Sequence, residues 1–132
     1  MWTIRTMGGI ALLLAGSTWL WLTPGFAGRD VATSGALWWT TRLLCFVTIA
    51  GFCVATYGLF ARHPWWETAA LASSAIGLVA LVTYAVAAAR GGEPTGTWLW
   101  NVFVHVLMLA GIAVLLLVPA LERWVDSHVM SP

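Results

Sequence analysis

The chain has 132 residues, of which 61% are hydrophobic and only 8% are charged. Soluble domains carry about 25% charged residues, so six basic and five acidic side chains are too few to cover a water-soluble fold of this size. The formal net charge is +1 and no basic cluster is present, which excludes nucleic acid as a partner. Every basic side chain is an arginine, and ten residues are tryptophan.

Four apolar segments, separated by short polar interruptions, make up most of the chain. A membrane-spanning helix needs about 20 apolar residues, so four crossings fit this length. The interruptions at Thr23–Gly25, Arg62–Pro64 and Arg90–Pro94 contain the proline and glycine that end helices. Pro119 marks a kink or an exit from the membrane. The sequence therefore predicts one all-α domain, an integral membrane four-helix up-down bundle with helices at residues 6–22, 37–61, 66–89 and 97–118 and an interfacial or frayed tail at 119–132.

The first segment also resembles a secretory signal peptide. Arg5 precedes an apolar run, and Gly25-Phe26-Ala27 ends it with small residues. We nevertheless expect this segment to be retained as a membrane helix, because tryptophans at its far end are typical of an interface anchor.

The ten tryptophans lie near the ends of the expected helices. The indole ring favours the headgroup level of a membrane, so this distribution predicts two aromatic belts. The arginines divide equally between the two sides, and only the amino terminus favours a cytoplasmic location for the chain ends. The same balance leaves a dual-topology protein as an alternative.

Small residues recur every four positions on the third segment, at Ala69, Ser73 and Gly77. Such a stripe allows two helix backbones to approach closely in lipid. We expect it to be a packing surface, with Gly51 and Gly58 on the second segment as candidate partners.

The polar side chains that enter the expected spans are Arg42, Tyr84, Asn101 and His105. All four fall in the half of the bilayer away from the chain ends, and Asn101 and His105, four residues apart, share one helix face. They predict a pocket with Arg42 as its fixed charge, suited to a lipid headgroup or a quinone. Alternatively, Arg42 extends to the headgroups and the other three form hydrogen bonds between helices.

The sequence gives little support for a haem site, a disulfide, a metal site or a catalytic site. A bis-histidine haem site needs two facing histidines, whereas His105 is the only histidine inside an expected span. Cys45 and Cys53 lie two helical turns apart, too far for a disulfide. No catalytic motif or metal-ligand spacing is present, so we expect no catalytic residue, no metal and no cofactor.

Three acidic residues, Glu67, Glu122 and Asp126, fall on the side of the chain ends together with arginines. Surface ion pairs would account for them. Because no carboxylate falls within the bilayer, the sequence argues against a carboxylate-driven exporter.

Several features recur in a characteristic order along the chain: the apolar start Gly8–Leu14, the beginning of the second helix at Gly35–Trp39, the hairpin Arg62–Trp66, the pair Ser73-Ser74, and Asn101. This order resembles a widespread family of short bacterial four-helix membrane proteins of uncharacterised function. The resemblance covers most of the chain and implies a protein of the bacterial plasma membrane, with no assigned activity. In that family the first helix often carries histidines near its far end, where this chain has Ser17-Thr18-Trp19.

We therefore expect a non-enzymatic, multi-pass protein of the bacterial plasma membrane that acts as an accessory or lipid-interacting module. Its partners would be the lipid bilayer and either another membrane protein or further copies of itself. One alternative is a quinone- or lipid-binding redox accessory that uses the polar pocket. Another is a dual-topology oligomeric channel or transporter.

Overall fold

A computed structural model describes residues 2–23 and 33–131. Within these residues the protein is entirely helical, which confirms the all-α class. The predicted break at Pro24 and Gly25 lies outside the described residues. The elements are α1 (Ile4–Ser17), the 3₁₀ helix η1 (Thr18–Leu22), α2 (Ala36–Phe60), α3 (Trp66–Gly91), α4 (Thr95–Leu117) and α5 (Pro119–Val129).

Local sequence signals explain where several helices begin and end. The Thr3 hydroxyl accepts a hydrogen bond from the Thr6 backbone N–H at 3.1 Å and so caps the start of α1. Gly92 adopts a left-handed conformation with φ of 85°, which ends α3. Pro119 occupies the first turn of α5, where its missing N–H is not needed.

Three helices, α2, α3 and α4, are long and apolar enough to cross a membrane. The first predicted span is divided differently, because α1 has only 14 residues and continues into the 5 residues of η1. Among the described residues, three of the four predicted spans therefore correspond to helices that are long and apolar enough to cross a membrane.

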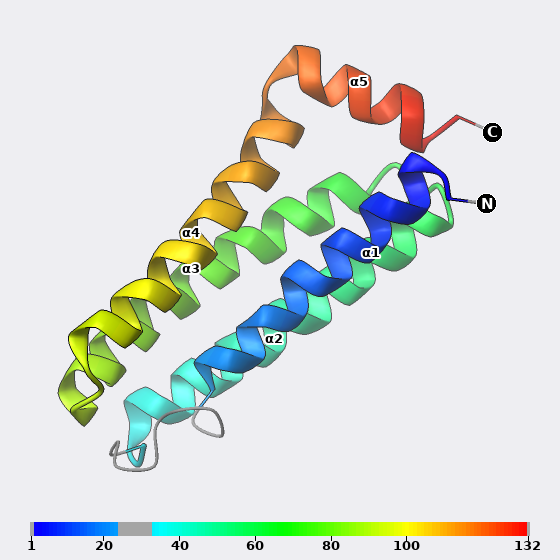
Figure 1. Cartoon of the computed structure of the whole chain (residues 1–132). Helices are drawn as coiled ribbons and strands as arrows, with labels where there is room; N and C mark the ends of the chain where they lie inside the picture. The colour runs from blue at the N-terminus through cyan, green and yellow to red at the C-terminus, as the bar shows by residue number, and fades with distance from the viewer. Residues whose placement is uncertain (1, 24–32, 132) are drawn as a thin grey trace.

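Figure 1 shows how the helices are arranged. α2 and α3 lie side by side and form the centre, α1 lies along α2, and α4 lies along α3. Both chain ends lie at the same end of the molecule, which we call the terminal end. α5 crosses the terminal end from α4 toward α1 (Figure 1).

The fifth helix shows that the expected tail is helical over Pro119–Val129 and not frayed there. Its side chains Val125 and Val129 are buried, so it packs as part of the molecule. The Arg5 guanidinium on α1 donates one hydrogen bond to the Val129 carbonyl at 2.5 Å and another to the Ser131 carbonyl. These bonds hold the end of α5 against α1.

The small-residue stripe of α3 lies in the interior, where Ser73 and Gly77 are buried and Ala69 is partly buried. A Cβ atom added to Gly51 would lie 2.1 Å from Ser73 Oγ, so a glycine is required at this close approach of α2 to α3. Gly58 contacts a different part of the structure, since its added Cβ would lie 2.7 Å from Cζ3 of Trp65.

One tryptophan lies away from the helix ends, where the sequence analysis had expected all ten. Trp19, Trp38 and Trp66 are buried, but Trp38 and Trp66 lie in the first turns of α2 and α3. Trp19 donates a hydrogen bond from its indole N–H to the Gly77 carbonyl at 3.3 Å, in the interior of the protein. The exposed tryptophans include Trp2, Trp21, Trp39, Trp65, Trp100 and Trp124.

Candidate functional site

Two of the predicted pocket residues form a short hydrogen-bonded chain at the end opposite the terminal end. The Tyr84 hydroxyl donates to Glu93 Oε2 at 3.0 Å and accepts from Asn101 Nδ2 at 2.9 Å. Tyr84 and Glu93 are both buried. The chain connects α3, the turn after it and α4, and it gives the buried Tyr84 hydroxyl both a donor and an acceptor partner.

His105, one turn further along α4, connects that helix to η1. Its Nε2 atom lies 3.1 Å from the Thr18 carbonyl oxygen, and its Nδ1 atom lies 2.6 Å from the Asn101 carbonyl oxygen. A neutral imidazole has one N–H and can donate to only one of these two acceptors. The Trp19 ring packs edge-on against the imidazole with centroids 4.8 Å apart. The sequence places Thr18 at the level of His105 but does not predict either contact, because both depend on how the first segment folds.

Arg42 is separate from this group. It lies on the exposed side of α2, next to the buried Thr41. No hydrogen bond or ion pair joins it to Tyr84, Asn101 or His105. The structure therefore brings Tyr84 and Asn101 together, places His105 nearby on the same helix, and leaves Arg42 apart.

A cavity of about 350 Å³ lies in a different place, between α1 and α4 and beneath α5. α1 and α4 are linked at the other end of this gap, where Thr18 contacts both His105 and the Met108 sulfur. Toward the terminal end the two helices separate (Figure 1). None of the four predicted pocket residues lines the cavity. Its lining consists of Ile4, Gly8, Ala11, Leu12, Ala15, Leu59, Trp66, Met108, Gly111, Ile112, Leu115, Leu116, Trp124, Val125 and Val129.

The cavity exists because small residues face each other across it. Gly8, Ala11 and Ala15 lie on one side of α1, and Gly111 lies on α4. An added Cβ at Gly111 would meet nothing within 4 Å, so the space beside it is open. The spacing of these α1 residues is the kind of signal that predicts close helix packing, but here the stripe lines an open space.

One buried polar atom of a cavity-lining residue has no partner. Trp66 lines the cavity and is only 5% exposed, and its indole N–H forms no hydrogen bond within the described part of the chain. Leaving a buried donor unsatisfied costs about 1–3 kcal/mol. The nitrogen atom is itself buried, as is the equally unpaired indole nitrogen of Trp38, so it does not point to a ligand in the cavity.

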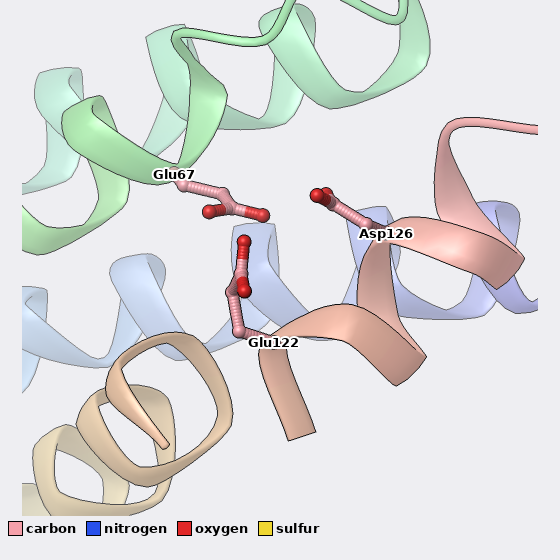
Figure 2. A group of neighbouring side chains, drawn as sticks. All are labelled: Glu67, Glu122 and Asp126. Carbon is pink, nitrogen blue, oxygen red and sulfur yellow. The ribbon is translucent and has the colours of Figure 1, made fainter. Parts of the chain in front are cut away.

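Three carboxylates lie beside the cavity at the contact between α3 and α5, and we call them the acidic rim. Figure 2 shows Glu67 on α3 pointing toward Glu122 and Asp126 on α5, and their oxygens lie within 4.8 Å of one another. Glu67 follows Trp66 and Asp126 follows Val125, both of which line the cavity.

The ion pairs that the sequence analysis expected for these carboxylates are absent. No arginine forms a salt bridge with the acidic rim among the residues that the structure describes. Glu67 Oε1 is buried and has no hydrogen-bond partner. Like charges at this separation repel each other, and a proton shared between two of the carboxylates would relieve that repulsion.

No family model, curated protein or solved structure matches this chain. The structure itself defines the class, a small helical protein with three candidate membrane-spanning helices. Its function is therefore argued from the cavity and the groups around it.

Proposed function

We propose that this chain is a non-enzymatic integral membrane protein that holds an apolar lipid chain in the cavity between α1 and α4. It would act as an accessory or lipid-interacting module of the bacterial plasma membrane, with its ends in the cytoplasm. Three helices suited to cross a membrane support the location. The many large apolar side chains exposed on α2, α3 and α4 also support it, because they need a lipid environment.

The observation that carries the proposal is the chemistry of the cavity. Its volume of about 350 Å³ falls in the range of about 300–1,000 Å³ that is common for small-molecule sites. No charged residue lines it. Apolar cavities do not hold water stably, so an apolar chain from the surrounding bilayer is the favoured occupant.

The polar residues at the opposite end support a different role. Tyr84, Asn101 and His105 use their polar atoms on one another, on Glu93 or on the Thr18 carbonyl. These bonds join helices and use most of the polar atoms of the three side chains. We therefore place the ligand in the apolar cavity and assign these three residues to helix packing.

The proposal can be tested with a substitution that fills the cavity from the side of α4. In the Gly111→Leu variant the new side chain enters the open space beside α4, so we expect it to displace a bound chain. Purified protein would be exchanged extensively into fresh detergent, and the remaining lipid would be extracted and quantified by mass spectrometry. We expect stoichiometric lipid on the wild-type protein and a several-fold loss on the variant.

Gly96→Leu is the matched control. Gly96 lies on the same helix, also has nothing within 4 Å of an added Cβ, and does not line the cavity. This control should retain lipid as the wild-type protein does. Equal retention by the Gly111→Leu variant, or a wild-type protein without stoichiometric lipid, would contradict the proposal.

A further inference from the structure

The cavity between α1 and α4 has a definite length, which follows from the residues that line it. On α1 these residues run from Ile4 near the terminal end to Ala15, and they recur on one face of the helix. The helical rise between these two residues is about 16 Å, roughly half of the hydrocarbon thickness of about 30 Å. In a membrane the cavity would therefore reach through one leaflet, the one on the side of the terminal end.

The deep end of the cavity, away from the terminal end, is closed. Just beyond Ala15, the Thr18 hydroxyl donates to the Met108 sulfur at 3.9 Å, and the Thr18 carbonyl oxygen lies 3.1 Å from His105 Nε2. These contacts join η1 to α4, whereas α1 and α4 separate toward the terminal end (Figure 1). A chain in the cavity therefore meets a floor, which we define by the lining residues Ala15 and Met108.

The side of the cavity between α1 and α4 is open. Ala11, Gly111 and Leu115 line the cavity and are exposed, whereas Leu12 and Leu116 line it and are buried. In a membrane the exposed residues would face lipid, so a chain can enter from the bilayer without crossing water. Because lipid tails are as apolar as the lining, packing decides which chain is preferred. Dispersion contacts are lost wherever a bound chain leaves a void.

We infer that the cavity selects a saturated acyl chain by its length, and that the preferred chain reaches the floor when it is extended. Among common saturated chains, an extended myristoyl chain matches the rise from Ile4 to Ala15 most closely. A shorter chain leaves a void above the floor, and a longer chain has to bend or keep its excess outside the cavity. This inference rests on the proposed function and adds the length class of the bound chain to it.

The experiment is a chain-length competition on the full-length protein. Detergent-purified protein would be incubated with equal amounts of dilauroyl, dimyristoyl, dipalmitoyl and distearoyl phosphatidylcholine. After exchange into fresh detergent, the retained lipids would be extracted and quantified by mass spectrometry. We expect the wild-type protein to retain the dimyristoyl lipid several-fold more than the distearoyl lipid.

Two substitutions should move the floor in opposite directions. Ala15→Leu adds a side chain at the deep end, so the preference should shift toward the dilauroyl lipid. Met108→Ala removes side-chain volume at the same level, so the preference should shift toward the dipalmitoyl lipid. Ala110→Leu and Met7→Ala are the matched controls, because both residues are exposed and neither lines the cavity. These controls should keep the wild-type preference.

The outcomes separate the inference from the proposed function. A wild-type protein that retains all of these lipids equally, or the distearoyl lipid most, overturns the length inference and leaves the proposed function in place. A preference that neither floor variant shifts also overturns the inference, because the deep end then does not set the length. A wild-type protein that retains no lipid overturns both. The wild-type comparison needs no variant, so it stands even where a substitution prevents folding.

Discussion

Tyr84 provides the sharpest residue-scale test of how α3 and α4 are held together. Its hydroxyl group is the hydrogen-bond partner of both the buried Glu93 carboxyl and the Asn101 amide. In the Tyr84→Phe variant the aromatic packing stays, but Glu93 keeps its burial and loses its donor. We expect the free energy of unfolding to fall by about 1–3 kcal/mol, the usual cost of an unsatisfied buried polar group. Unfolding in a dodecyl sulfate titration would measure this change.

The control for this substitution is Tyr57→Phe. Tyr57 is 64% exposed, and its hydroxyl forms no hydrogen bond with a described residue. The same chemical change there should leave stability nearly unaltered. If both variants are equally stable, the Tyr84 hydroxyl does not contribute to helix packing in the way that the geometry indicates.

The site residues could be predicted from the sequence only in part. Tyr84, Asn101 and His105 were recognisable because polar side chains inside apolar segments need partners, and Asn101 and His105 share a face by spacing alone. The exposure of Arg42 could not be derived. It depends on the rotation of α2 about its axis, and that helix has large apolar side chains on its exposed face as well as on its buried face, as Phe46 and Phe52 illustrate.

At the scale of elements, α5 shows why the sequence prediction missed a helix. The segment after Pro119 is too short to cross a membrane, and its composition is polar. The signal was present in the spacing of Val125 and Val129, which lie four residues apart and are both buried against the rest of the protein. Pro119 is itself favourable in a first helical turn, so it begins α5 where the sequence analysis expected only a kink or an exit.

The bonds from Arg5 to the end of α5 lead to a prediction about this helix. In the Arg5→Gln variant the Val129 and Ser131 carbonyls lose their charged donor, so we expect α5 to separate more often from α1. Hydrogen–deuterium exchange of the amides at residues 120–131 should become several-fold faster. The opening of the cavity should increase with it, because Val125 and Val129 form part of its lining.

Arg90→Gln is the matched control for the Arg5 substitution. Arg90 is exposed, lies at the end of α3 away from the terminal end, and forms no hydrogen bond or ion pair with any described residue. This variant should leave exchange in α5 unchanged. Wild-type exchange rates in the Arg5→Gln variant would instead mean that the apolar contacts of α5 are sufficient to hold it.

At the scale of the whole molecule, the sequence predicted the long helices well and their packing poorly. The expected spans at 37–61, 66–89 and 97–118 differ by at most two residues at each end from α2, α3 and α4, because proline and glycine mark the boundaries. Interior and outer surfaces are both apolar in a protein of this composition. Neither the burial of Trp19 nor the gap between α1 and α4 could therefore be derived from hydropathy.

The lengths of the helices predict how many times the chain crosses the membrane. The rise of α1 is about 21 Å and η1 adds about 10 Å, which together approach the hydrocarbon thickness of about 30 Å. We therefore expect the first segment to cross, with four crossings in all and both chain ends on one side. This expectation follows from the position of the chain ends in Figure 1 and from the span lengths.

Single introduced cysteines would measure the number of membrane crossings. The background for these variants has Cys45 and Cys53 replaced by alanine. In sealed vesicles of one orientation, a membrane-impermeant thiol reagent should label the Trp2→Cys and Ser131→Cys variants from the same side and the Gly96→Cys variant from the opposite side. If Trp2→Cys is labelled together with Gly96→Cys, the first segment does not cross and the molecule has three spans. Partial labelling of every site from both sides would instead identify a dual-topology protein, in which copies of the chain cross the membrane in both orientations.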